Sequence, residues 1–282
     1  MRRLFLMRLG GTVFNWGKDP ALFAQKHVEK GFTAAVCPDF LNAGDTAMNT
    51  LFVRELEQRG ILFAEVGAWC NPLSRDQKLA EQNIEHMIER LALAEELGAK
   101  TCVNILGTYT GKSWYGPHPD NYSADFFAQA VDVARRVVDA VKPKRTTLSF
   151  EMMPYNFLDH PKAYCKFLKA VDRPGVAVHF DPCNCINSPH LYCHITQFLE
   201  EAFALFGSQI VSVHLKDIAL LDEPVTAMFQ EVLPGAGHMD YHTLLRCLNR
   251  LDSDTPAIIE HLPDEQSFDA AAAYISEVQA SL

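Results

Sequence analysis

The stretch TTLSFEMMPYNFLDHPKAYCKFLKAVDRPGVAVHFDP, residues 146–182, contains one complete strand–helix–strand unit. Two short runs of β-branched and apolar residues, TTLSFEMM and VAVHFDP, flank a longer segment whose apolar residues recur at helical spacing. Two parallel strands joined by a helix are the repeating unit of α/β proteins. The stretch therefore predicts two neighbouring parallel strands, with a helix over residues 161–171 between them.

The same alternation extends along the chain. Short β-branched or apolar runs begin at residues 4, 33, 61, 101, 146, 176, 210 and 256, and a helical pattern follows each. Eight such units predict an α/β fold, a single (β/α)8 TIM barrel with eight parallel strands, formed by residues 1–282 as one domain. A doubly wound sheet would need a G-x-G-x-x-G loop after its first strand, and GGTVFNWG at residues 10–17 does not match.

Composition narrows the class of protein. The 282 residues are 48% hydrophobic and carry a net charge of −10, which argues against a nucleic-acid partner. No apolar run approaches the ~20 residues that a membrane-spanning helix needs, so we expect no membrane partner. Eight cysteines lie scattered in apolar runs without a preceding signal peptide, and we expect a cytoplasmic protein with free thiols.

The last four predicted strands each carry one residue of a type that binds metal ions. Glu151, Asp181 and Glu260 lie near the ends of their runs, and His214 lies in IVSVHLKD. Side chains alternate in direction along a strand, and apolar neighbours such as Phe150 occupy the opposite face. Because adjacent strands lie ~4.8 Å apart, four side chains from neighbouring strand ends can converge on one point.

Three carboxylates and one imidazole form a ligand set dominated by oxygen. Such a set suits one divalent metal ion, with Mn²⁺ or Mg²⁺ favoured and Co²⁺ or Zn²⁺ compatible with the nitrogen ligand. Three carboxylates this close would repel one another without a cation, which favours a metal site over a bare acid/base cluster. We therefore predict that Glu151, Asp181, His214 and Glu260 bind one divalent metal ion.

Five further polar residues are candidates for substrate contact, because loops and strand ends form the catalytic face of such barrels. They are Lys216, Asn184, Glu65, Asn104 and His118. The alternative for each is a structural role, such as surface packing for His118 or a charge at the strand mouth for Lys216.

Other polar residues are expected outside the metal site. Asp240 should cap the helix that begins at Tyr241. His261 follows Glu260 directly, so strand alternation predicts that it points out of the barrel. The C-x-C pair in DPCNC is a weak metal motif, which we interpret as ordinary free cysteines.

At these residues the sequence resembles the xylose isomerase-like TIM-barrel superfamily, in particular its sugar phosphate isomerase/epimerase branch. The motifs are SFEMMP at 149–154, HFDPCN at 179–184, VHLKD at 213–217, PGAGHMDY at 234–241 and IIEHL at 258–262. The resemblance implies an isomerase or epimerase acting on a sugar, keto-sugar or related polyol through a metal-stabilised enediolate. It also implies that Glu151 and Glu260 are the catalytic acid/base pair, and that the protein is a homo-oligomer, a dimer or tetramer.

Two positions depart from the pattern of similar ketose 3-epimerases. Those enzymes commonly carry a histidine where this chain has Asn184 and an arginine where it has Leu220. Lys216 and Asn184 are therefore expected to bind substrate hydroxyls or a carboxylate instead.

Three alternative functions stay open. A metal-dependent lyase or dehydratase would use the same residues and expel a β-substituent from the enediolate. A DNA repair enzyme similar to endonuclease IV would need more histidine ligands and a basic surface, and the net charge of −10 argues against it. A binding protein without activity would not need the four ligand residues.

Overall fold

A closed barrel of eight parallel strands forms the centre of the computed structural model, which describes residues 7–223 and 225–282. Around the barrel the strands follow the order β1-β10-β7-β6-β5-β4-β3-β2, and each neighbouring pair is parallel. The prediction of an α/β fold with eight parallel strands in a TIM barrel is confirmed. Residues 4–6 of the first predicted strand lie outside the described residues.

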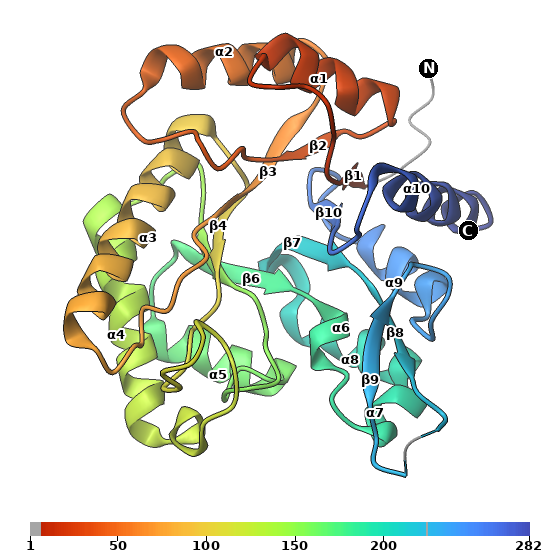
Figure 1. Cartoon of the computed structure of the whole chain (residues 1–282). Helices are drawn as coiled ribbons and strands as arrows, with labels where there is room; N and C mark the ends of the chain where they lie inside the picture. Colours follow the sequence, from red (N-terminus) through yellow and green to blue (C-terminus); the bar gives the residue numbers. More distant parts are fainter. Residues whose placement is uncertain (1–6, 224) are drawn as a thin grey trace.

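Helices surround the barrel strands (Figure 1). The barrel strands are β1 (Arg8–Gly10), β2 (Ala34–Val36), β3 (Leu62–Gly67), β4 (Thr101–Asn104), β5 (Leu148–Phe150), β6 (Val176–Phe180), β7 (Ile210–Leu215) and β10 (Pro256–Ile259). The long helices are α1 (Pro20–Glu29), α2 (Thr46–Glu57), α3 (Gln77–Leu97), α4 (Ala124–Val141), α5 (Pro161–Val171), α8 (Ile195–Phe206), α9 (Tyr241–Leu248) and α10 (Glu265–Ala280).

Polar side chains start the helices and glycines follow several of them. Asp240 accepts a hydrogen bond from the Thr243 N–H, which confirms its predicted role as the cap of α9. Gly31, Gly60 and Gly98 have φ angles of 70°, 68° and 65°, a left-handed conformation that glycine adopts without a steric penalty.

The strand residues alternate between the barrel interior and the helical layer. On β6, Phe180 packs against three phenylalanines of α8, with ring centroids 5.5–6.3 Å apart. On the inner face, the hydroxyls of Ser149 and Thr101 lie 2.6 Å apart across β5 and β4. This alternation confirms the predicted faces and directs the polar residues of the last four strands inward.

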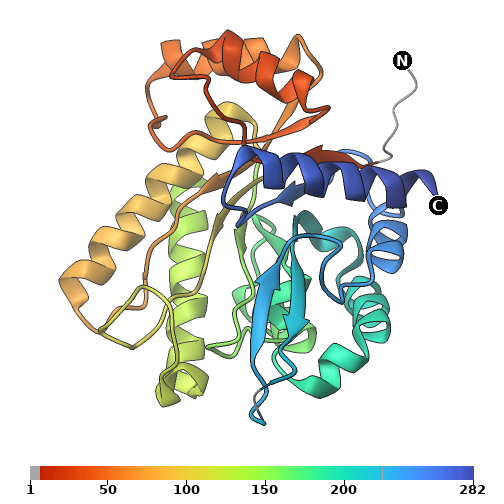
Figure 2. The ribbon, with the colours of Figure 1, turned by 45° about the vertical axis from the view of Figure 1, so that its right-hand side comes forward.

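Several short elements were not predicted. An antiparallel hairpin, formed by β8 (Asp217–Leu220) and β9 (Phe229–Val232), extends from the end of β7 (Figure 2). The others are the short helices α6 (Pro182–Cys185) and α7 (Pro189–Cys193) and the 3-10 turns η1 (Pro119–Tyr122) and η2 (Gly207–Gln209).

All eight cysteines are free thiols, as expected from the sequence. In residues 7–223 and 225–282, no helix has the length and apolar character needed to cross a membrane.

Candidate metal centre

Four predicted metal ligands come together where β5, β6, β7 and β10 lie side by side in the barrel. The Nδ1 atom of His214 lies 2.6 Å from Glu260 Oε1, 3.3 Å from Glu151 Oε1 and 3.7 Å from Asp181 Oδ2. One ligand atom from each of the four residues lies within 4.8 Å of the others. The structure therefore brings the four side chains close enough to share one ion.

Lys216 lies among the same carboxylates. Its Nζ atom is 2.6 Å from Glu260 Oε1, 2.7 Å from Asp181 Oδ2 and 3.3 Å from Glu151 Oε1, and the side chain is only 2% exposed. Together with a protonated His214 it would offset two of the three negative charges of Glu151, Asp181 and Glu260. A divalent cation and the Lys216 ammonium would therefore compete for the same oxygen atoms.

The environment shifts the pKa values of these groups in different directions. Burial raises the pKa of Glu151, although Lys216 and His214 partly offset the effect. Burial also disfavours the charged form of Asp181, but Lys216 and His214 outweigh it and hold the pKa of that carboxyl well below its ordinary value. The pKa of Glu260 is likewise lowered, because the attraction of His214 and Lys216 exceeds the cost of burial.

The atoms available at this cluster fit a divalent cation. Asp181 Oδ2 and Glu260 Oε1 are buried, and neither accepts a well-oriented hydrogen bond despite the short distances to Lys216. Buried polar atoms are ordinarily hydrogen-bonded, so two free acceptors in one cluster are unusual. Carboxylate oxygens and one imidazole nitrogen are suitable ligands for a divalent ion. The cluster could hold a metal ion.

The short helix α6 orients Asp181. One carboxylate oxygen accepts the Asn184 N–H at 3.2 Å, and Pro182 occupies the first turn, where its missing N–H costs nothing. The other oxygen is left to face the cluster. Asn184 in turn donates a hydrogen bond from its side-chain amide to Glu151 Oε1 at 2.9 Å. The D-P-x-N motif thus positions two of the four predicted ligands.

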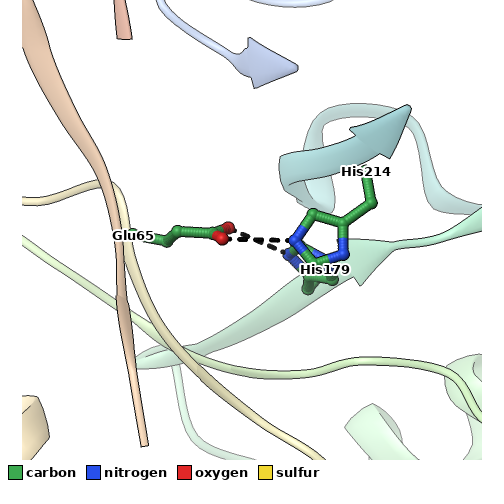
Figure 3. Close-up of side chains that lie close together, drawn as sticks. All are labelled: Glu65, His179 and His214. Carbon is green, nitrogen blue, oxygen red and sulfur yellow. Dashed lines mark hydrogen bonds and ion pairs between the residues drawn. The ribbon is translucent and has the colours of Figure 1, made fainter. Parts of the chain in front are cut away.

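Glu65, on β3, supports His214 from the opposite side of its ring (Figure 3). Glu65 Oε1 lies 3.2 Å from His214 Nε2, and Oε2 accepts a hydrogen bond from the Ser212 hydroxyl at 3.1 Å. If Nε2 carries the proton, this N–H group donates a hydrogen bond to Glu65, and the lone pair of Nδ1 faces the carboxylates. Glu65 is 3% exposed and lies behind His214, and its predicted contact with substrate stays a prediction.

His179 completes this buried group. Its Nδ1 lies 3.7 Å from Glu65 Oε2, its ring lies 4.0 Å from that of His214, and neither ring nitrogen has a hydrogen-bond partner. Burial lowers the pKa of His179 to about 3, which keeps the ring neutral. One ligand atom from each of Glu65, His179 and His214 lies within 4.8 Å of the others, so these three residues could also hold an ion. His179 belongs to the motif HFDPCN, but the sequence alone predicted no role for it.

Asp217 anchors the hairpin that follows β7. Its carboxylate accepts four backbone N–H groups, from Ile218, Gly235, Gly237 and Met239, at 2.8–3.1 Å. These contacts explain the aspartate of the motif VHLKD and the two glycines of the motif PGAGHMDY. A Cβ atom on Gly237 would lie 2.3 Å from Asp217 Oδ1, so only glycine fits there.

A cavity of about 590 Å³ opens above the cluster. Glu151, Glu260 and Asn184 line it, and Glu231 of β9 stands at its rim. The size lies within the range of about 300–1,000 Å³ that is common for small-molecule sites.

One sequence prediction, the outward direction of His261, differs from the structure, and substrate contact by Asn104 and His118 stays a prediction. His261 lies at the cavity, with Nδ1 2.9 Å from Glu231 Oε2, because β10 ends at Ile259 and residue 261 adopts a φ of 59°, which breaks the strand alternation. Asn104 is fully buried, and its side-chain oxygen accepts the Cys70 N–H. His118 accepts the Asp120 N–H at the start of η1. Neither Asn104 nor His118 is among the residues that line the cavity.

The sequence and the fold were compared with those of known proteins. The sequence model of a family described as xylose isomerase-like TIM barrel matches residues 24–278. A curated relative from Haemophilus influenzae, provisionally named L-ribulose-5-phosphate 3-epimerase, is 23% identical over 66% of this chain. The match spans 60% of the length of that relative.

Solved structures share the fold over almost the full chain. A 3-keto-D-glucoside 4-epimerase from E. coli has a TM-score of 0.68 at 14% identity, covering 96% of this chain and 99% of that one. Endonuclease IV from Thermus thermophilus has a TM-score of 0.71 at 15% identity, covering 97% and 99%. At such low identity these likenesses show the fold alone.

Proposed function

The chain belongs to the xylose isomerase-like TIM barrel family, and from that premise we propose that it is a divalent-metal-dependent sugar isomerase or epimerase. The observation that carries the proposal is the convergence of Glu151, Asp181, His214 and Glu260 at the floor of an open cavity. The names of the curated relative and of one structural neighbour, both epimerases of sugars, support the reaction class.

The four residues would hold one ion, and their oxygen-rich set favours Mn²⁺ or Mg²⁺. When bound, a divalent cation would polarise the carbonyl of a keto-sugar and stabilise the negative charge of its enediolate. The Glu65 carboxylate would accept a hydrogen bond from the Nε2–H group of His214. This hydrogen bond would keep the Nδ1 atom of His214 directed at the ion.

Glu151 and Glu260 are proposed as the proton-transfer pair. Their pKa values are shifted in opposite directions, and a pair separated in this way suits one acid and one base. Glu260 would remove the proton from the carbon beside the carbonyl, and Glu151 would deliver a proton from the other face. The Asn184 amide holds Glu151 in place, and Lys216, which is buried beneath the cavity, is proposed to neutralise part of the charge of the carboxylates.

The proposal is tested by incubating the Mn²⁺-loaded enzyme in deuterated water with a panel of ketoses, 3-keto-glycosides and their phosphates. NMR would report both net conversion and deuterium at carbon. We expect Glu151→Gln to reduce turnover by about 100- to 10,000-fold, because Gln cannot deliver the proton. Glu81→Gln, on the exposed face of α3, is the matched control and should turn over like the wild type.

Undiminished turnover by a metal-loaded Glu151→Gln enzyme would refute the assigned role. Deuterium incorporation without loss of water supports the isomerase or epimerase, whereas loss of a β-hydroxyl group would identify a lyase or dehydratase. Cleavage of DNA at abasic sites would identify the repair function of the structural neighbour, which the net charge of −10 disfavours.

A further inference from the structure

A continuous aromatic wall borders the cavity. Trp69, Trp114, Tyr115 and Tyr155 all line it, and they come from the loops after β3, β4 and β5. The ring centroids of Trp69 and Trp114 lie 6.4 Å apart, those of Trp114 and Tyr115 5.2 Å, and those of Tyr115 and Tyr155 6.4 Å. Four aromatic rings, each beside the next, therefore form one side of the site.

Much of this wall faces solvent. Trp69, Trp114 and Tyr115 are 38%, 42% and 44% exposed, which is unusual for side chains of this size. The backbone leaves room for the Trp69 ring, because a Cβ atom on Gly67 would lie 2.4 Å from the indole nitrogen. Exposed aromatic rings held in place beside a polar cleft are suited to binding an apolar molecular face.

The other side of the cavity is acidic. Glu151, Glu231 and Glu260 line it, and among the cavity-lining residues in the described part of the chain none is a lysine or an arginine. Lys216 lies below, 2% exposed and already paired with the carboxylates. His261 is likewise engaged, by Glu231. A phosphate group in this cavity would meet carboxylates, and within residues 7–223 and 225–282 no unpaired cationic side chain lines the cavity to bind it.

From these two features we infer that the substrate is an unphosphorylated keto-glycoside, whose ring ketone supplies the carbonyl that the proposed function requires. This inference rests on the proposed function and names its substrate class. One face of a pyranose ring, made of C–H bonds, is apolar and can stack on an aromatic ring, as can an aromatic aglycone. The reacting sugar lies at Glu151 and Glu260, and the aglycone or second ring lies against Trp69 and Trp114.

Binding of unreactive probes tests this inference independently of catalysis. Isothermal titration calorimetry would compare phenyl β-D-glucoside, phenyl β-D-galactoside and phenyl α-D-mannoside with the 6-phosphates of the three free sugars. Each titration is made with and without Mn²⁺, so that phosphate bound by the ion itself is recognised. Because the probes do not turn over, a failure here leaves the deuterium experiment on Glu151→Gln unaffected.

We expect at least one phenyl glycoside to bind about tenfold or more tightly than its sugar phosphate in the metal-free protein. Trp69→Ala and Trp114→Ala should each weaken the binding of that glycoside by about tenfold, since each substitution removes one stacking ring. Trp16→Phe is the matched control, because Trp16 packs against Phe23 and Phe40 away from this wall. Unfolding temperatures of the variants verify that the fold is intact.

Several results would overturn the inference. They are tighter binding of the sugar phosphates without Mn²⁺, no binding of any phenyl glycoside, or unchanged glycoside affinity in both alanine variants. Loss of self-association in those variants with unchanged glycoside binding would also overturn it, since the wall would then be a contact between copies of the chain.

Discussion

The imidazole ring of His214 lies between two sets of acidic side chains, and we expect this position to affect the affinity for a metal ion. Its Nδ1 faces the three carboxylates of the candidate metal centre, while its Nε2 faces Glu65. A carboxylate behind a metal-binding histidine fixes its tautomer and raises its basicity. Glu65 therefore belongs to the support of the site, although it comes from a strand on the far side of the barrel.

Glu65→Gln should weaken Mn²⁺ binding by about 10- to 100-fold, because an amide orients the His214 proton less strongly. Calorimetric titration would measure the dissociation constant. Ser212→Ala is the control, since it removes a second contact of Glu65 but keeps its charge. Equal affinity in Glu65→Gln and the wild type would show that Glu65 does not support His214.

The four predicted ligands could be found from the sequence because each ends or lies within an apolar strand run, where strand alternation fixes its direction. The role of Glu65 could not be found in this way, because its contact with His214 joins residues 149 positions apart across the barrel. His261 was predicted incorrectly because alternation was extended two residues past the strand end at Ile259, into a left-handed backbone conformation.

The β8–β9 hairpin depends on the backbone contacts of Asp217. The sequence does not predict this hairpin, because its strands are half-exposed and lack a strong apolar alternation. The hairpin carries Glu231 to the cavity rim. Its anchor is therefore expected to affect both stability and the shape of the site.

Gly237→Ala should lower the free energy of unfolding by about 1–3 kcal/mol, since the added methyl group would collide with Asp217 and with the backbone oxygen of Ile218. Chemical denaturation would measure the loss. Gly111→Ala is the matched control, because an added Cβ there meets no atom within 4 Å. Equal free energies of unfolding for the two variants would show that the backbone at Gly237 does not pack closely against Asp217.

On α1, His27 is a buried histidine distant in sequence from the candidate metal centre. Its Nδ1 lies 2.9 Å from the Phe23 oxygen, and its Nε2 has no partner. Burial lowers the pKa of His27 from 6.5 to about 4. Below pH 6.5 the unfolded chain therefore binds a proton that the folded protein does not, so stability falls between about pH 6.5 and 4.

Between pH 7 and pH 4.5, His27 should account for about 2–3 kcal/mol of the fall in the free energy of unfolding. The His27→Asn variant should therefore lose about 2–3 kcal/mol less than the wild type over this pH range. Urea denaturation at both pH values would measure it, with His242→Asn, an exposed histidine on α9, as the control. If the wild type and His27→Asn lose equal stability on acidification, the assignment to His27 is wrong.

The barrel as a unit explains why one part of the chain carries the proposed chemistry. Four successive barrel neighbours, β5, β6, β7 and β10, deliver the metal-centre residues, while the loops after β3, β4 and β5 supply the aromatic wall. The strand count and the order of elements could be predicted from hydrophobic periodicity. The aromatic residues of the wall are visible in the loop sequences, but the contacts between their rings could not be predicted, because loop conformation is set by contacts between loops rather than by local pattern. Assembly into a dimer or tetramer stays a prediction.

The most direct test of the account is a calorimetric titration of metal-free protein with Mn²⁺, comparing the wild type with Asp181→Asn. Asparagine keeps the cap on α6 but removes a charge from the cluster, and Asp139→Asn, in an exposed ion pair, is the control. We predict one ion per chain in the wild type and in Asp139→Asn, with binding lost or weakened by about 100-fold or more in Asp181→Asn. Absence of saturable binding in the wild type, or equal binding by Asp181→Asn, would contradict the assignment of the metal centre.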